Sequence, residues 1–496
     1  MGFKPTQEQL DAIEKARTGQ DLKILAFAGA AKTTTLELIA KDLFFKKVLY
    51  LAFNKSIATE ASNRFSFNVT CKTTHSLAYS AIVGQTPAFK DKLKGRLTGF
   101  NVAKMLGLRS MSECTPLTPS QYGSMVLKTV TNFCNSGYPE FHKKLVPLNE
   151  MYDLAVKRKG EITPDLMRKV YADAQRLWKK MIDPNDTTYI THDTYLKLHE
   201  LTRPPLSQYD IIMLDESQDS NDVVLSIVGH AKAQKIFVGD PYQQIYSWRG
   251  SVNAMDEIHT PHIAYLSQSF RFGDQVAALA DHILEYELEC DMPIRGFESV
   301  ADTVCELAFP DCMIFRTNAG VIGEAMSQIQ RGRKVCIIGD IEALIRLIDG
   351  VNELQQTNRS SHPELMDFLS YQDFVEYTES PFGKDLAVIV KLLEEKGYKA
   401  LKQALETIRH NTEQDSDIIL TTAHKSKGRE FETVKLGGDF KAIEDLSEKR
   451  NAGLPVPDIN KEEFNLLYVA VTRAKKAIDV SSLRYFDELL EVEDVA

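Results

Sequence analysis

The sequence has 496 residues, a formal net charge of −10, 43% hydrophobic residues and 26% charged residues. This composition is that of a soluble globular protein, and the length predicts two to four domains. No apolar run reaches the ~20 residues of a membrane span, and the N-terminus lacks the apolar core of a signal peptide. We therefore expect no membrane association and a cytoplasmic location, or a nuclear one in a eukaryote. The seven scattered cysteines include no CxxC pair and support neither a disulfide framework nor a zinc site.

Positive charge is concentrated in two regions of this acidic chain. Residues 143–180 contain ten lysines and arginines against five acids, and residues 90–109 contain six against one. Nucleic-acid binding depends on where positive charge lies rather than on its total. Each region is also compatible with a solvated helix face, so both interpretations stay open.

Short apolar runs alternate with helical patterns along the chain. The runs lie at 23–27, 48–53, 211–214, 235–238, 263–266, 312–315, 335–338, 417–421 and 433–437. They are typical of strands buried on both faces of a parallel sheet. Mainly helical stretches interrupt them, which predicts an α/β fold with two parallel-sheet cores, each with a helical insertion. The expected parts are residues 1–84 with 206–270 (first core), 85–205 (its insertion), 271–339 with 413–496 (second core) and 340–412 (its insertion).

A loop of small residues separates the first predicted strand from the helix that follows. It reads Ala26-Phe27-Ala28-Gly29-Ala30-Ala31-Lys32-Thr33-Thr34. Backbone N–H groups of such a loop can approach phosphate oxygens; Lys32 would reach the β- and γ-phosphates and Thr33 would bind Mg²⁺. Ala31 replaces the usual P-loop glycine, which costs on the order of 1 kcal/mol if φ is positive there. By itself, the segment is equally compatible with an ordinary strand–turn–helix.

Two acids follow the predicted strand 211–214. Asp215 and Glu216 are therefore expected at the carboxyl end of a buried strand, where parallel sheets bind ligands. Asp215 is suited to the Mg²⁺ shell, and Glu216 is suited to be the base that polarises an attacking water. Two acids in this place more often cap the following helix. The lysine-threonine loop earlier in the chain is what favours a catalytic site.

A polar turn with aromatic residues follows the predicted strand 235–238. Gln243 is suited to sense a γ-phosphate or to orient its water. Tyr246 and Trp248 offer flat faces on which unpaired bases can stack, with Arg249 beside them for a phosphate. A tryptophan here is also compatible with a core position, although the surrounding polar residues favour base stacking.

Together these motifs resemble the superfamily 1 helicases of the UvrD/Rep/PcrA group, and within it the helicase portion of the F-box DNA helicases. The likeness runs from about residue 6 to residue 480, in the family's order and spacing. Its further segments are Ala52–Ala58, Cys71–Tyr79, Thr191–Leu198, Gln268–Phe272 and Asn465–Ala474. The resemblance implies two RecA-like P-loop NTPase cores with ATP between them. The sequence departs from the family at Ala31 and in a short second insertion, and no F-box segment is expected.

The resemblance also implies roles for single residues. Nucleotide contacts are implied for Gln9 (adenine), Glu430 (ribose), and Arg271 and Arg473 (γ-phosphate). Contacts to a single strand are implied for Phe53, Asn54, Thr74, His75 and His424. Arginines supplied by the second core would make hydrolysis depend on closure of the two cores.

We therefore expect a Mg²⁺-dependent, ATP-hydrolysing DNA helicase that is active as a monomer on single-stranded DNA and at single-strand/duplex junctions. The resemblance implies 3′→5′ movement. Two alternatives stay open: a translocase that strips bound protein with little unwinding, and a nucleotide-dependent clamp that hydrolyses ATP poorly. Stacking and phosphate contacts do not separate RNA from DNA. The sequence identifies neither a protein partner nor a pathway, so roles in repair and recombination both stay open.

Overall fold

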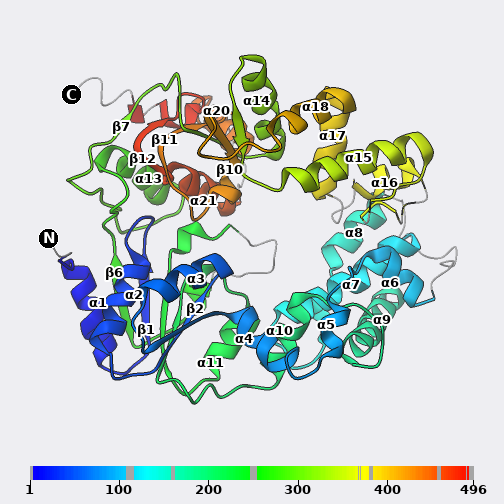
Figure 1. The fold of residues 1–496 in the computed structure, drawn as a ribbon, viewed down its shortest axis with the longest axis horizontal. Helices are drawn as coiled ribbons and strands as arrows, with labels where there is room; N and C mark the ends of the chain where they lie inside the picture. Colours follow the sequence, from blue (N-terminus) through cyan, green and yellow to red (C-terminus); the bar gives the residue numbers. More distant parts are fainter. Residues whose placement is uncertain are drawn as a thin grey trace.

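The computed structural model describes residues 4–490 except 108–116, 158–161, 246–253, 363, 367, 369, 379–383, 455–459 and 488. The described residues form two α/β cores and two helical insertions (Figure 1). Each core contains a described sheet of six strands, and all neighbouring strands run parallel. The predicted fold class is therefore confirmed. Within these residues no helix is both long enough and apolar enough to cross a membrane.

The first sheet has the strand order β3-β2-β4-β5-β1-β6. Its strands are β1 (Leu22–Ala26), β2 (Val48–Ala52), β3 (Val69–Thr73), β4 (Ile211–Leu214), β5 (Gln234–Gly239) and β6 (His262–Leu266). Helices α1 (Gln7–Arg17), α2 (Lys32–Asp42) and α3 (Lys55–Arg64) cover one face, and α4 (Thr74–Ile82), α11 (Asp222–Gly229) and α12 (Ala254–Glu257) cover the other. Strand β2 is buried at every residue, because helices exclude water from both faces.

The second sheet has the strand order β7-β12-β11-β8-β10-β9. Its strands are β7 (Thr303–Val304), β8 (Cys312–Phe315), β9 (Val335–Ile337), β10 (Ile418–Thr422), β11 (Phe431–Leu436) and β12 (Ala474–Asp479). Helices α13 (Asp274–Tyr286), α20 (Lys441–Asn451) and α21 (Lys461–Val471) cover one face, and α14 (Asn318–Gln330) covers the other. The short helix α19 (Ala423–Ser426) follows β10 directly.

The two insertions are helical in the described residues. The first contains α5 (Ala88–Lys92), α6 (Gly99–Met105), α7 (Pro119–Asn135), α8 (Leu148–Lys157), α9 (Pro164–Ile182) and α10 (His192–Leu201). The second contains α15 (Ile341–Thr357), α16 (Tyr371–Thr378), α17 (Lys384–Lys396) and α18 (Tyr398–Ile408). Helices α17 and α18 are separate, because Gly397 between them adopts a φ of 76°.

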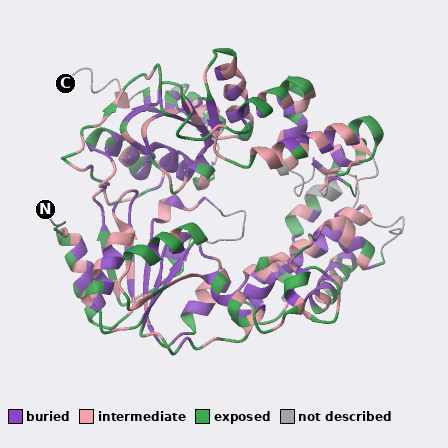
Figure 2. Ribbon diagram, in the orientation of Figure 1, coloured by how far each residue is buried: buried purple, intermediate pink, exposed green. Residues whose placement is uncertain are grey.

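Among the described residues, the two halves of the chain contact each other both at the cores and at the insertions. Phe27 and Ala28 of the first core belong to the hydrophobic cluster that fills the second core, where buried residues gather (Figure 2). At the far side, Arg96 of the first insertion pairs with Glu364 of the second. A cavity of about 250 Å³ beside this pair is lined by both insertions. The first contact fixes the loop after β1 against the second core.

Candidate nucleotide and nucleic-acid site

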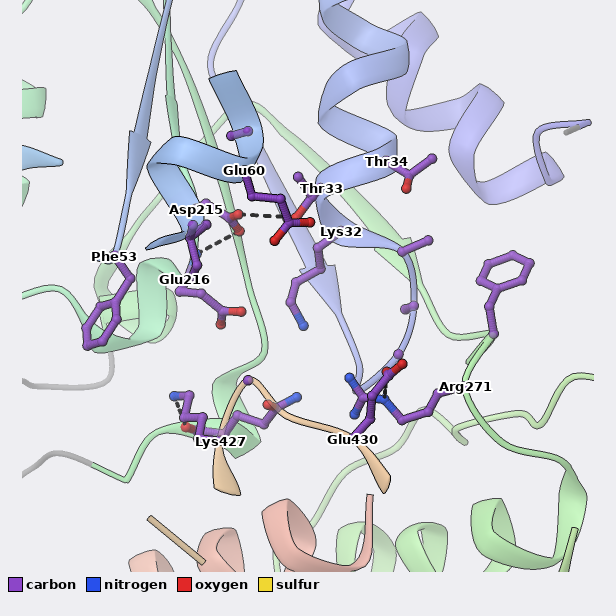
Figure 3. Close-up of a pocket in the computed structure, with 18 of the residues that line it drawn as sticks. Lys32, Thr33, Thr34, Phe53, Glu60, Asp215, Glu216, Arg271, Lys427 and Glu430 are labelled. Atoms are coloured by element: carbon purple, nitrogen blue, oxygen red, sulfur yellow. Dashed lines mark hydrogen bonds and ion pairs between the residues drawn. The ribbon is translucent and has the colours of Figure 1, made fainter. Parts of the chain in front are cut away.

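A cavity of about 750 Å³ lies between the two cores, at the carboxyl ends of the strands of the first sheet (Figure 3). Ligands bind at this edge of parallel sheets, because loops and helix N-termini converge there. Both cores line it. The residues predicted for catalysis or nucleotide binding that lie in its wall are Gly29, Ala30, Ala31, Lys32, Thr33, Thr34, Asp215, Glu216, Gln243, Arg271, Glu430 and Arg473.

The loop after β1 has the backbone of a phosphate-binding loop. Ala31 has φ 54° and ψ 42°, in the left-handed region, directly before α2. Gly29 has φ 72°, and a Cβ there would lie 2.3 Å from Oγ of Ser269 and 2.9 Å from Cβ of Arg271. Glycine is therefore required at 29 both by conformation and by close packing, whereas Ala31 accepts an unfavourable conformation. Ala26, Phe27 and Ala28, which were also predicted to contact the nucleotide, are buried and do not line the cavity.

Lys32, Thr33 and Asp215 form the polar floor of the cavity. Nζ of Lys32 lies 3.4 Å from the carbonyl oxygens of Ala26 and Phe27. Oγ1 of Thr33 lies 3.5 Å from Oδ2 of Asp215 (Figure 3). A hydroxyl and a carboxylate at this separation are the oxygen donors that suit Mg²⁺ bound together with phosphate.

The two acids after β4 ionise differently. Burial, and then the charge of Glu216, raise the pKa of Asp215. Burial opposes ionisation of Glu216 as well, but Lys32 and Lys427 outweigh it and lower the pKa of that carboxyl. Its Oε2 also accepts a hydrogen bond of 2.6 Å from Gln218. Glu216 is thus ionised and fixed, as a base that polarises water must be.

Two arginines reach the cavity from beyond β6. Nε of Arg271 lies 3.0 Å from Oε2 of Glu430, and Nη1 donates to the carbonyl oxygen of Thr472 at 2.7 Å. Arg473 is 1% exposed and donates to the carbonyl oxygen of Val469 at 2.7 Å. Burial, and then the charge of Arg271, lower the pKa of Arg473 to about 9, so the Arg473 guanidinium is cationic near neutral pH. Two adjacent cations facing a phosphate loop predict an anionic ligand.

Two predicted ligands have other contacts. Gln9 is 1% exposed and does not line the cavity; its Oε1 accepts from the Thr6 N–H at 3.1 Å and its Nε2 donates to Oγ1 of Thr35 at 3.0 Å. The amide therefore caps α1 and joins it to α2. Asn54, predicted to contact a nucleic-acid strand, lines the nucleotide cavity instead, and its Oδ1 caps α3 through the Ile57 N–H at 2.9 Å.

Several residues of the cavity wall were not predicted from the sequence, among them Phe270 and Lys427. Phe270, beside Arg271, adds an aromatic wall. Lys427 of the second core reaches across to the first, where Nζ bonds Oδ2 of Asp219 and, at 2.6 Å, the carbonyl oxygen of Gln243 (Figure 3). Both residues lie beside positions that the sequence predicts to be functional, Arg271 and Glu430. A sequence motif does not indicate which of its side chains crosses between the cores.

A second cavity, of about 640 Å³, adjoins the first and lies between the first core and its insertion. Its wall contains three residues predicted to contact single-stranded nucleic acid, Phe53, Thr74 and His75. Lys128 and Lys144 of the insertion also line it. The phenyl ring of Phe53 is 40% exposed. A groove with an exposed ring and two ammonium groups combines the two features by which proteins bind single strands.

The residues predicted to contact single-stranded nucleic acid do not all lie in this groove. Nε2 of His75 lies 3.3 Å from Oδ1 of Asp193. His424, at the start of α19, lies on the second core; burial, and then the charge of Arg316, lower its pKa to about 4. Tyr246, Trp248 and Arg249 lie outside the described residues.

Comparison with known proteins gives matches over both halves. Residues 5–257 match the UvrD/REP helicase N-terminal domain, and residues 207–485 match the UvrD-like helicase C-terminal domain. F-box DNA helicase 1 of Gallus gallus is 32% identical over 96% of this chain and 49% of its own length. F-box DNA helicase protein 1 of Schizosaccharomyces pombe is 31% identical over 95% of this chain and 57% of its own. ATP-dependent DNA helicase PcrA of Leuconostoc citreum is 23% identical over 25% of this chain and 18% of its own. The chain thus spans about half the length of the F-box relatives.

Proposed function

Because the chain belongs to the UvrD-like helicase family, we propose that it couples ATP hydrolysis to 3′→5′ movement along single-stranded DNA and to unwinding of duplex. The observation that carries this proposal is the cavity between the cores. Its wall brings the phosphate loop and two acids of the first core together with Arg271 and Arg473. We also propose the four-part division of the chain given by the sequence, with boundaries near 84, 205, 270, 339 and 412.

The first core binds and activates the nucleotide. The loop amides and Lys32 bind the phosphates, since the amides and the ammonium group present positive charge to the cavity. Thr33 and Asp215 would hold Mg²⁺, which supplies charge neutralisation between phosphate oxygens when bound. Glu216 then accepts a proton from the attacking water, and Gln243 orients that water.

The second core completes the site. Arg271 and Arg473 face developing negative charge on the transferred phosphate, and cations in a water-poor site stabilise such charge strongly. Hydrolysis therefore requires the two cores to be closed on each other. Release of phosphate removes the anion that holds the arginines against the first core, so each cycle opens and closes the gap between the cores.

The strand occupies the groove that adjoins the nucleotide cavity. Phe53 offers a stacking face, and Lys128 and Lys144 offer charges for the sugar-phosphate backbone. DNA is the proposed polymer because the similar proteins carry the name DNA helicase. The direction of movement rests on the family resemblance alone.

Two measurements test the proposal. The first is ATP hydrolysis with and without an oligothymidine strand: we expect strong stimulation in wild type, none in Lys32→Ala, and ATP binding without turnover in Glu216→Gln. Absence of stimulation in wild type would leave a nucleotide-dependent clamp. The second compares duplexes with a 3′ or a 5′ single-stranded tail. Unwinding of the 3′-tailed duplex alone is expected, whereas displacement of bound protein without unwinding would identify a stripping translocase.

A further inference from the structure

A tyrosine of the second core is inserted between two loops of the first core. Tyr468, on α21, has no exposed surface. Its hydroxyl accepts a hydrogen bond from the N–H of Ala28 at 3.1 Å and donates one to Oδ2 of Asp240, also at 3.1 Å. Ala28 belongs to the phosphate loop, and Asp240 follows β5. One hydroxyl thus joins both loops across the boundary between the cores.

Buried hydrogen bonds continue from Asp240 to the catalytic groups. The N–H of Asp240 donates to Oε1 of Gln218 at 3.1 Å, and Nε2 of Gln218 donates to Oε2 of Glu216 at 2.6 Å. In a second branch, Nε2 of Gln243 donates to Oδ2 of Asp240 at 2.6 Å. Both groups proposed to act on the water are therefore connected through Asp240 to Tyr468.

Packing explains the ring of Tyr468 but not its hydroxyl. The ring belongs to the hydrophobic cluster that the two cores share, and a phenylalanine would fill the same space. A buried hydroxyl is unfavourable unless it is hydrogen-bonded. Burial, and then the carboxylate of Asp240, hold the pKa of Tyr468 well above its usual range, so the hydroxyl stays protonated and donates. Tyr468 is not among the described residues that line the nucleotide cavity, so it acts through its neighbours.

We propose that the Tyr468 hydroxyl is a positioning group that aligns Glu216 and Gln243 with the phosphate loop when the second core is docked. It links the two cores by a contact that the nucleotide does not make itself. Without it, the loop N–H of Ala28 loses its partner, and the carboxylate of Asp240 loses its bond to the second core. The inference rests on the proposed function, because it explains how docking of the second core would control ATP hydrolysis.

The test compares two tyrosine-to-phenylalanine variants. Tyr468→Phe removes the positioning hydroxyl. Tyr485→Phe is the matched control, since Tyr485 belongs to the same hydrophobic cluster, is buried, and also bonds a carboxylate, that of Glu287 at 3.2 Å. Steady-state ATP hydrolysis with oligothymidine gives kcat and KM, a fluorescent ATP analogue gives nucleotide affinity, and thermal unfolding gives Tm. Wild type is measured first.

The free energy of a hydrogen bond to a charged group corresponds to a change of about 10- to 100-fold in a rate or equilibrium constant. We therefore expect kcat of Tyr468→Phe to fall by about that factor, with KM and nucleotide affinity within about threefold of wild type, and no change of kcat in Tyr485→Phe. An unchanged kcat in Tyr468→Phe overturns the inference. A parallel loss of kcat, affinity and Tm in both variants also overturns it, because the hydroxyl would then be purely structural. A wild type without DNA-stimulated hydrolysis would refute the proposed function itself.

A second variant approaches the same link from the first core. Asp240→Asn keeps the shape of the side chain but removes the carboxylate that accepts from Tyr468. If the two groups act together, the double variant should be no slower than the slower single variant, because the second substitution removes a link already lost. Multiplicative losses in kcat would contradict a shared role.

Discussion

Arg271 and Glu430 form an ion pair inside the nucleotide cavity, with Nε of the arginine 3.0 Å from Oε2 of the glutamate. Both residues are proposed to contact the nucleotide, at the γ-phosphate and the ribose. In the structure each neutralises the other, so nucleotide binding must exchange this pair for two new contacts. The guanidinium is kept near its place of action by Glu430 and by the carbonyl oxygen of Thr472.

Arg271→Ala is expected to reduce kcat by about 10³-fold, the smaller end of the range for an arginine that stabilises phosphoryl transfer. Nucleotide affinity should change less, because the phosphate loop is intact. The control is Arg450→Ala, which removes a glutamate-paired arginine of the second core that is bonded to Glu287 and does not line the cavity. Rapid-quench measurement of a single turnover separates the two effects. Equal losses in both variants would mean that Arg271 acts through stability.

Ala31→Gly should leave turnover intact or raise it, and should leave the free energy of unfolding within about 1 kcal/mol of wild type. Glycine relieves the left-handed strain at φ 54° but makes the unfolded chain more flexible. Gly29→Ala should instead abolish nucleotide binding, since its Cβ would meet Oγ of Ser269 at 2.3 Å. Nucleotide titration and urea unfolding of both variants check this contrast. A tolerated Gly29→Ala would show that the loop can move away from Ser269.

Lys144→Ala and Lys128→Ala should weaken single-strand binding similarly for all base sequences. A lysine that contacts a phosphate releases counterions, so each substitution should lower the slope of log affinity against log salt by about 0.7. Fluorescence anisotropy with oligothymidine and a mixed sequence at several salt concentrations measures this slope. Lys41→Ala is the control, because Lys41 is exposed in the last turn of α2 and lines neither cavity. An unchanged slope would exclude both lysines from the strand path.

His424 predicts a loss of stability in mild acid. Its pKa is about 4 in the folded chain against 6.5 in its reference state, so the unfolded chain takes up a proton first as the pH falls. The free energy of unfolding should therefore decrease as the pH falls from about 6.5 to 4. Above about pH 6.5, His424 should cause no such decrease. His424→Gln removes the effect. Urea midpoints of both proteins from pH 7.5 to 4.5 test it, and a difference that does not vary with pH would contradict a buried neutral histidine.

The central strands could be predicted from sequence because they are continuously apolar, as β2 and β4 are buried at every residue. Strands β3 and β12 were missed for the opposite reason. β3 lies at the edge of its sheet and reads Val-Thr-Cys-Lys-Thr, with no buried residue. β12 contains Lys475 and Lys476, and its outer neighbour β7 has two residues, so part of β12 behaves as an edge. Exposed strand positions need no apolar side chain and so give no run.

The site was predictable where a residue's role is local to its motif. Asp215 follows β4 directly, and Lys32 begins α2 after the loop that follows β1, so the sheet places both residues at one edge. Lys427 and Tyr468 were missed because their partners lie about 200 residues or more away, and contacts between the cores leave no periodic signal. The contact of Gln9 with adenine stays a prediction; in the structure its amide is hydrogen-bonded to Thr6, the N-cap of α1, and to Thr35 of α2.

Phe53, Asp215 and Asp219 line both the nucleotide cavity and the adjoining groove. These side chains therefore form a wall that the nucleotide cavity and the adjoining groove share. A substitution in this wall is expected to affect both proposed activities, because the same side chains border both cavities. Genetic separation of function has to be sought outside it, with Arg271 for hydrolysis and Lys144 for the grip on the strand.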